Sequence, residues 1–345
     1  MMSNTRFQPL AALALVALAL TGCGDKGSST DTASGTTGAT TTTGGTTASG
    51  GDKKPLKLAF VTNNASDYWT IVKKGVEKAE KEDPSVQVDF QLPKPPEAAD
   101  QKTIVENETT KGVDGIAISP ADAKNQTEML NAAAAKSLLI TQDSDAPQSN
   151  RSCYIGTDNH AAGVKLGGEI KKSLPQGGKI VVFVGSLDAQ NAQDRIGGIE
   201  EALKGSNVTI IDKRTDGADH AKAKSNVADI LVKDPDVAGL VGIWSYNGPA
   251  ILSAVQDANK VGKVKILCFD EEPNTLSGVQ SGAIDATIVQ NPYEFGYQGV
   301  QMMAKYLRGD KSVFPANKQN IIDTRVLHKD DIDAFKADLD KKRAG

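Results

Sequence analysis

Short runs of consecutive apolar residues recur along the chain from Leu56 onward, and amphipathic stretches separate most of them. A run that is apolar at nearly every position is typical of a strand buried on both faces of its sheet. In the intervening stretches the apolar residues fall at helical spacing, as Val72, Val76 and Ala79 do. The pattern predicts strands at residues 56–62, 86–92, 115–119, 138–142, 179–185, 208–212, 237–243, 263–270 and 284–290.

Buried strands that alternate with helices predict parallel sheets covered by helices on both faces, which is the doubly wound α/β class. Nine or more strands are many for one sheet of this kind. The pattern also restarts, because a strand at residues 57–61 followed by a helix is echoed by a strand at 179–184 followed by a helix. We therefore predict two similar, Rossmann-like α/β lobes.

The N-terminal part of the chain does not follow this pattern. Arg6 precedes an apolar stretch, residues 10–20, that is too short to cross a bilayer as a helix. The stretch leads into the tetrapeptide Leu-Thr-Gly-Cys, whose last residue is Cys23, and this arrangement is typical of a bacterial lipoprotein signal peptide. We expect residues 1–22 to be removed and the Cys23 thiol to carry a lipid. The protein would then be exported and anchored in a membrane, in the periplasm or at the cell surface.

The segment after Cys23 contains almost only glycine, serine, threonine and alanine, and no aliphatic side chain larger than alanine. Such a segment cannot bury enough apolar surface to offset the entropy of ordering. We expect residues 23–54 to form a lipidated, flexible tether with a span of roughly 30 Å. An inert spacer is the alternative interpretation.

Residues 55–345 are enough for one large or two medium domains with hydrophobic cores. The whole chain is 39% hydrophobic and has a formal net charge of −4, which offers no basic surface for nucleic acid. Besides Cys23 the chain has two cysteines, and both lie within apolar, strand-like runs. We expect these two, Cys153 and Cys268, to be buried free thiols rather than a disulfide.

The polar and aromatic residues that follow the predicted strands suggest a ligand site. In open α/β sheets the ligand crevice lies beyond the carboxyl ends of the strands. The residues at these ends include both tryptophans, several amides, hydroxyls and carboxylates and one arginine, but no histidine or cysteine. Flat rings beside hydrogen-bonding groups suit a pyranose or furanose sugar. The set is Ser66, Asp67, Tyr68, Trp69, Ser119, Pro120, Asp143, Ser144, Asp145, Asp188, Asn191, Arg195, Trp244, Tyr246, Asn247, Asp270, Glu271, Gln290 and Asn291.

Enzyme and cofactor chemistry find little support in the sequence. His160, His220 and His328 show no mutual spacing that suggests a metal site or a catalytic triad. The chain has no G-x-S-x-G, H-E-x-x-H or G-x-x-x-x-G-K motif. We expect neither catalysis nor a bound metal or cofactor.

Several segments of the chain resemble the type I periplasmic binding proteins, in particular the ribose-binding-like sugar receptors of ABC importers. The most specific segments are residues 61–69, 154–159, 191–198, 268–273 and 286–292, and the resemblance covers nearly all of residues 56–327.

The resemblance implies two lobes joined by a multi-strand hinge. The N-terminal lobe would comprise residues 55–157 and 291–320, and the C-terminal lobe residues 158–290 and 321–345. Gln290 would lie at the hinge.

The resemblance also implies roles for individual residues. Tyr68 and Trp69 would stack on the sugar, Asp143 would accept hydrogen bonds from its hydroxyls, and Arg195 would donate to its oxygens. Three further residues would complete the cage around the ligand: Asn247, Asp270 and Gln290.

Two departures from the family pattern affect the choice of sugar. Ser66 stands where ribose receptors carry an asparagine, and Ser144 stands where they carry an arginine, so the resemblance does not assign ribose itself. Trp244 would supply a second stacking face. Ser119, at the end of a predicted strand, completes the predicted site.

Each of these residues also has a purely structural interpretation. Tyr68 and Trp69 could pack in the core, and Asp143 and Asp270 could cap helices or form turns. Arg195 could be a solvated helix residue or a salt-bridge partner. Asn247 could be a helix N-cap.

The expected function is that of an exported, lipid-anchored and monomeric solute receptor. It would close its lobes over one small polyhydroxylated ligand and deliver the ligand to the membrane subunits of an ABC permease. One alternative is a receptor of the same fold that presents its ligand to a chemoreceptor or a kinase. Another alternative changes the ligand to a nucleoside, a cyclitol or a furanosyl signal. A repressor core of the same fold is disfavoured by the export signal and by the absence of a helix-turn-helix.

Overall fold

The structure is a computed structural model that describes residues 53–94 and 98–344. The predicted signal peptide, the lipidation site Cys23 and nearly all of the predicted tether lie outside the described residues. No described helix combines the length and the hydrophobicity needed to cross a bilayer.

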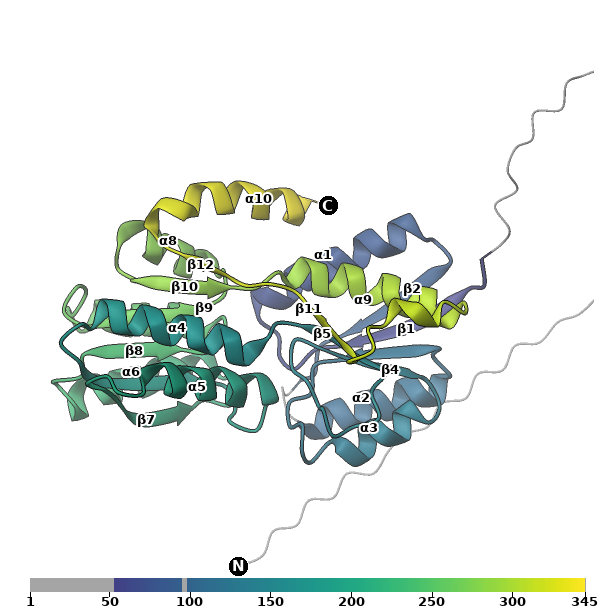
Figure 1. The fold of residues 1–345 in the computed structure, drawn as a ribbon, viewed down its shortest axis with the longest axis horizontal. Helices are drawn as coiled ribbons and strands as arrows, with labels where there is room; N and C mark the ends of the chain where they lie inside the picture. Colours follow the sequence, from purple (N-terminus) through teal and green to yellow (C-terminus); the bar gives the residue numbers. More distant parts are fainter. Residues whose placement is uncertain (1–52, 95–97, 345) are drawn as a thin grey trace, which may run out of the picture. The chain divides into compact units, whose positions relative to one another are not determined.

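Lobe 1 is built on a six-stranded parallel sheet whose strand order is β11-β5-β4-β3-β1-β2 (Figure 1). Its four central strands are apolar and buried because helices cover both faces of the sheet, whereas its two edge strands are partly exposed. They are β1 (Leu56–Val61), β2 (Val86–Gln91), β3 (Gly115–Ile118), β4 (Leu138–Gln142), β5 (Cys153–Gly156) and β11 (Gln319–Ile321).

Lobe 2 repeats the same arrangement with the strand order β12-β10-β9-β8-β6-β7. All of its pairs are parallel except the pair between β12 and β10. The prediction of two doubly wound α/β lobes is therefore confirmed. The strands of this sheet are β6 (Gly178–Val184), β7 (Val208–Thr215), β8 (Gly239–Gly242), β9 (Lys265–Phe269), β10 (Ala286–Val289) and β12 (Arg325–Leu327).

Two layers of helices cover the sheet of lobe 1. One layer, α1 and α9, packs on β1 through apolar side chains such as Val72, and the other layer, α2 and α3, packs through Val105 and Leu130. The helices are α1 (Asp67–Glu82), α9 (Pro292–Leu307), α2 (Ala98–Lys111) and α3 (Thr127–Ala134), and a 3-10 turn, η1 (Lys311–Val313), follows α9.

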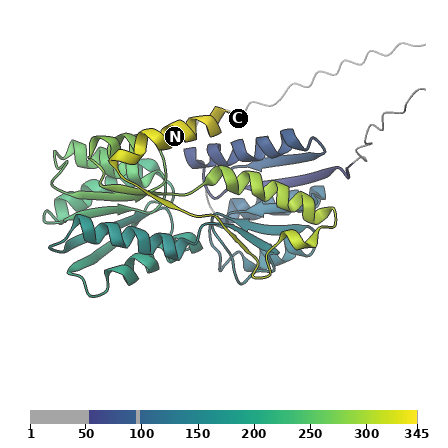
Figure 2. The same cartoon turned by 45° about the horizontal axis from the view of Figure 1, so that its top comes forward.

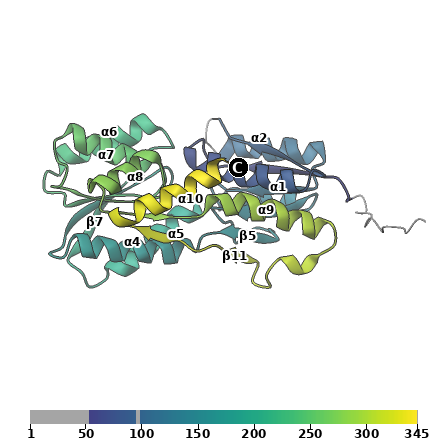
Figure 3. The same ribbon diagram turned by 90° about the horizontal axis from the view of Figure 1, so that it is seen from above.

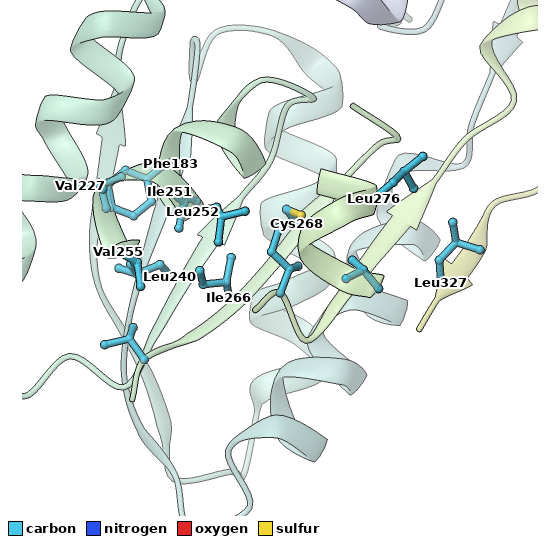
Figure 4. Close-up of a cluster of buried hydrophobic side chains, with 14 of the residues drawn as sticks. Phe183, Val227, Leu240, Ile251, Leu252, Val255, Ile266, Cys268, Leu276 and Leu327 are labelled. Carbon is cyan, nitrogen blue, oxygen red and sulfur yellow. The ribbon is translucent and has the colours of Figure 1, made fainter. Parts of the chain in front are cut away.

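The sheet of lobe 2 is enclosed in the same way. On one face α4 and α5 pack together, and on the other face α6, α7 and α8 bury the apolar cluster that Figure 4 shows around Cys268 and Ile251. Both Cys153 and Cys268 are buried free thiols, as predicted. The helices are α4 (Asn159–Ser173), α5 (Gln190–Leu203), α6 (His220–Lys233), α7 (Asn247–Asp257), α8 (Pro273–Ser281), the 3-10 turn η2 (Lys329–Asp331) and α10 (Ile332–Ala344).

The chain passes between the two sheets three times. It leaves lobe 1 after β5 to form α4, it returns after β10 to form α9, and it crosses again between β11 and β12, which are consecutive strands in different sheets (Figure 2). The helix α10 then packs with α8 of lobe 2 and also contacts α1 of lobe 1 (Figure 3). The lobes are therefore joined by three crossings and by the C-terminal helix.

All nine predicted strands are present, with bounds that differ by a few residues. Three short strands lie outside the nine predicted ranges. The strand-like run around Cys153 forms β5, whereas three residues with exposed positions give no apolar run in β11 and β12. They extend each sheet by one strand at corresponding edges.

The contact between α4 and α5 depends on glycine. A Cβ atom at Gly163 of α4 would overlap the carbonyl oxygen of Arg195 on α5, whereas a Cβ at Gly168 of the same helix would meet no atom within 4 Å. We expect Gly163→Ala to lower the free energy of unfolding by about 1–3 kcal/mol, because the two helices must separate.

Gly168→Ala is the matched control, and it should raise the free energy of unfolding by about 1 kcal/mol because alanine favours the helix. Urea denaturation of both variants measures the difference. Equal effects of the two substitutions would contradict the close packing of α4 on α5.

Candidate functional site

A buried crevice lies where the carboxyl ends of strands from the two sheets meet. Little free space remains between its side chains. Seven of the eleven crevice residues predicted from the sequence line it: Ser66, Tyr68, Trp69, Asp143, Arg195, Trp244 and Asp270. The other four, Ser119, Ser144, Asn247 and Gln290, lie outside its lining.

Two carboxylates occupy equivalent places in the two lobes. Asp143 directly follows β4 and Asp270 directly follows β9, and these strands hold the same position in the two sheets. Both residues have a positive φ, 59° and 71°, which aspartate tolerates better than most residues. The left-handed turn ends each strand, and the fold repeat brings the two carboxylates into one crevice.

The carboxylate of Asp143 already accepts three hydrogen bonds. The Tyr68 hydroxyl donates to Oδ1 at 3.1 Å, and the Ser119 hydroxyl and the Asn191 amide donate to Oδ2 at 2.8 and 3.2 Å. Burial raises the pKa of Asp143, while the charge of Arg195 and these hydrogen bonds oppose that shift. Ser119 therefore supports Asp143 from behind the crevice.

Asp270 is held by residues beside the crossings between the lobes. Its Oδ1 accepts a hydrogen bond from the Gln290 amide at 2.8 Å, and the Gln290 oxygen accepts one from Thr157 at 2.9 Å. Burial raises the pKa of Asp270 to about 6, and the nearby charge of Arg195 opposes that shift. Gln290 thus links two of the three crossings to a crevice carboxylate.

Arg195 is 1% exposed, which rules out the interpretation as a solvated helix residue. Its Nε donates to Asn159 at 2.9 Å, its Nη1 donates to the Ile243 carbonyl at 2.8 Å, and the guanidinium lies 4.3 Å from the centre of the Phe269 ring. Its Nη2 is buried and has no hydrogen-bond partner among the described residues. The crevice therefore contains a fixed cation whose Nη2 amino group is unused.

Aromatic side chains from both lobes line the crevice. Tyr68 and Trp69 belong to the core of lobe 1 and also line the crevice. Packing in the core is therefore compatible with a place in the ligand site. Their rings meet edge to face, with centroids 5.1 Å apart. The indole nitrogen of Trp244 donates to Asn191 at 3.3 Å, while that of Trp69 finds no acceptor within the described part of the chain.

The structure gives Asn247 a different place from the one predicted. It is completely buried, its oxygen accepts the backbone N–H of Trp244 at 3.0 Å, and its amide donates to Asp216 at 3.0 Å. Asn247 is also the first residue of α7, and its side chain does not cap that helix. It fixes the turn that carries Trp244 instead of facing the crevice.

The sequence also missed part of the lining. Asn63, Asn64 and Ser245 face the crevice, and so does Asn191, which was noted at a strand end but not assigned to the site. Asn63 and Asn64 are the second and third residues after β1, so the rule that selected Asp143 and Asp270 could have found them.

Hydrogen bonds between the lobes show that the crevice is shut in this structure. Asn191 of lobe 2 donates through its amide to Asp143 and through its backbone N–H to the Ser144 hydroxyl at 3.3 Å, and both acceptors belong to lobe 1. Ser144 therefore takes part in the contact between the lobes and not in the lining.

We expect Asn247→Ala to lower the free energy of unfolding by about 1–3 kcal/mol. The substitution leaves the backbone N–H of Trp244 and one oxygen of buried Asp216 without partners. Asn226→Ala is the control, because this exposed amide only donates to the Thr215 carbonyl, and it should change stability by less than about 0.5 kcal/mol. Chemical denaturation measures both, and wild-type stability of Asn247→Ala would contradict its supporting role.

Comparison with known proteins supplies an independent result. A family model described as a periplasmic binding protein domain matches residues 58–311. The ribose import binding protein RbsB of Salmonella typhimurium is 27% identical over 212 residues, which are 60% of this chain and 70% of that protein.

Solved structures share the fold. An ABC transporter solute binding protein from Burkholderia graminis, in complex with D-arabinose, is 28% identical with a TM-score of 0.76 and covers 82% of this chain and 98% of its own. The structure of a XylFII–LytSN complex matches with 29% identity and a TM-score of 0.73, covering 81% and 99% of the two chains.

Proposed function

Because this chain belongs to the periplasmic binding protein family, among its ribose-binding-like sugar receptors, we propose that it binds one monosaccharide between its lobes and delivers it to an ABC permease. The relatives described above include a ribose import binding protein and a solute binding protein with bound D-arabinose. The protein is accordingly a binding protein and not an enzyme.

The observation that carries the proposal is the pair of equivalent carboxylates, Asp143 and Asp270, in one crevice with Arg195. A sugar hydroxyl can donate to a carboxylate and accept from a guanidinium, so a polyol can satisfy all three groups. The unused donors, Nη2 of Arg195 and Nε1 of Trp69, belong to residues that line the crevice and could donate to acceptor oxygens on the ligand. The rings of Trp69 and Trp244 offer faces on which sugar C–H groups can stack.

Size and charge narrow the ligand class. The shut crevice has little free space between its side chains, which favours a small ligand. The lining carries two carboxylates and one guanidinium, so a sugar phosphate or a sugar acid would meet net negative charge. A neutral pentose or hexose fits these limits.

The three crossings between the sheets would act as the hinge, with Gln290 and Thr157 linking two of them. A ligand that contacts Asp143 on lobe 1 and Asp270 on lobe 2 binds better to the shut form than to the open form. Such a ligand shifts the equilibrium toward closure. The residues that we propose to contact the ligand are those that line the crevice.

A second candidate function is ligand presentation to a protein other than a permease. The related protein XylFII has been solved in a complex with LytSN, so a close fold relative assembles with a further protein. Both functions require the same sugar-binding crevice. Co-purification of the lipidated protein with permease subunits supports transport, whereas co-purification with another membrane receptor supports presentation.

A screen of D-ribose, D-allose, D-arabinose, D-xylose and D-glucose by thermal shift tests sugar binding directly. A sugar at about 100 times its Kd should stabilise the protein by about 2.7 kcal/mol. For the sugar that binds, Asp143→Ala and Asp270→Ala should each weaken binding by about 2 kcal/mol, close to 30-fold, because a hydroxyl loses a charged acceptor.

Asp188→Ala is the control for these variants, because this carboxylate is exposed and bonds only within its own loop. Calorimetry measures the affinities, and far-UV circular dichroism checks the fold. Wild-type affinity in both crevice variants would exclude this site.

We also propose that the mature protein is a lipoprotein anchored through Cys23, with residues 23–54 as its tether. The support is the sequence Leu-Thr-Gly-Cys after a short apolar stretch. Cys23→Ser should move the protein from the membrane fraction to the soluble fraction of fractionated cells, while wild-type protein stays with the membranes. Retention of the variant on membranes would refute the lipid anchor.

A further inference from the structure

Two glutamates lie directly behind the crevice and face the opposite lobe. Glu271 and Glu272 follow Asp270 at the end of β9, and they border a gap between the lobes that is too narrow to hold a water molecule. The lobe 1 side of this gap is the first turn of α1. The residues that line the gap are Asp67, Tyr68, Ile71, Ser245, Asp270, Glu271, Glu272 and Arg343.

Glu271 is 2% exposed, and neither of its carboxylate oxygens has a hydrogen-bond partner among the residues that the structure describes. An ionised carboxylate in such a place would lose its hydration without compensation, which is strongly unfavourable. A proton on Glu271 removes the charge and most of this penalty. The shut form of the protein therefore favours a neutral Glu271.

The surroundings of Glu271 contain more acidic than basic groups. Its own loop contributes Asp270 and Glu272, α1 contributes Asp67, and α10 contributes Lys342 and Arg343. A larger cavity on the hinge side, which Glu271 also lines, adds further groups. These groups are Tyr293, Asp323, Arg325, Asp338 and, again, Lys342.

The pKa values agree with this geometry. Burial raises the pKa of Glu271 well above its ordinary value, and the charge of Asp270 adds to the shift, while Arg343 and Lys342 oppose it. Burial and the charge of Asp67 on the opposite lobe raise the pKa of Glu272 to about 7. Part of the rise in the pKa of Glu272 thus depends directly on how closely the two lobes approach each other.

We propose that closure of the lobes is coupled to proton uptake by the Glu271–Glu272 pair, so that the pair makes sugar affinity depend on pH. When the lobes separate, α1 moves away from the gap, water reaches both carboxylates and they ionise. Closing the lobes buries Glu271, partly buries Glu272 and favours the uptake of a proton. This inference takes the identity of the ligand, a sugar, from the proposed function. The burial of the glutamates between the lobes does not depend on that function.

The sign of the effect follows from linkage. A carboxyl whose pKa is higher in the shut form favours closure fully below its open-state pKa, and this preference disappears as the pH rises through the shut-state pKa. For Glu272 that range reaches about pH 7. Within this pH range, each coupled proton lowers the sugar affinity by up to about tenfold for every unit by which the pH rises.

Calorimetry can distinguish proton uptake by Glu271 and Glu272 from proton uptake by the crevice carboxylates, Asp143 and Asp270. The aldose that stabilises the protein in the screen is titrated at about pH 7 in phosphate, HEPES and Tris, whose ionisation enthalpies differ. The dependence of the binding heat on the buffer gives the number of protons taken up. The variants are Glu271→Gln, Glu272→Gln and the double variant, and the control is Glu106→Gln, whose side chain on α2 is 61% exposed.

We expect net proton uptake by the wild type and by Glu106→Gln, a smaller uptake by each single variant of the pair, and little uptake by the double variant. The double variant should bind the sugar more tightly than the wild type at about pH 8.5. Equal proton uptake by the wild type and the double variant would overturn the proposal, because any remaining linkage would then belong to Asp143 or Asp270.

A ligand-free measurement keeps this inference separate from the proposed function. Small-angle scattering of the wild type should give a larger radius of gyration at about pH 8.5 than at about pH 5.5, and the double variant should give the smaller radius at both. If no aldose binds, the proposed function fails while this comparison still decides the coupling. A radius that is independent of pH in both proteins would overturn it.

Discussion

The guanidinium of Arg195 lies in a buried crevice that also holds Asp143 and Asp270, and its charge opposes the rise in pKa that burial imposes on both carboxyls. Among the residues that line the crevice, Arg195 alone is a cation. Removing one partner from a buried set of charges costs about 3–5 kcal/mol, because the remaining charges lose their compensation. The carboxylates can therefore serve as ionised acceptors only while Arg195 stays in place.

Much of the surrounding structure serves to hold that guanidinium. The close contact between α4 and α5 at Gly163 brings the backbone of Arg195 against the helix that begins with Asn159. The Asn159 side chain accepts from Arg195 and donates to the carbonyl oxygen of Asp143 at 3.2 Å. The Asn159 amide, beside the first crossing, thus connects Arg195 of lobe 2 to the turn at Asp143 in lobe 1.

The sequence was sufficient for the central strands because a strand buried on both faces leaves a continuous apolar run. It missed β11 and β12, which are too short and too exposed to leave one. It was also sufficient for Asp143 and Asp270, because the end of a strand fixes where the next residue lies. It could not place Asn247, whose side chain turns toward Asp216 of a distant loop. Side-chain direction depends on neighbours that only the tertiary fold brings together.

The shut form combines attraction and repulsion at the same boundary. Ile71 of α1 joins the apolar cluster of lobe 2 that includes Phe335 and Leu339 of α10, and burying one such side chain contributes about 1.5–3 kcal/mol. Burial and the charge of Asp67 raise the pKa of Glu272 at this boundary, so an ionised Glu272 disfavours the shut form. Protonation of Glu272 removes that charge and leaves the apolar contact.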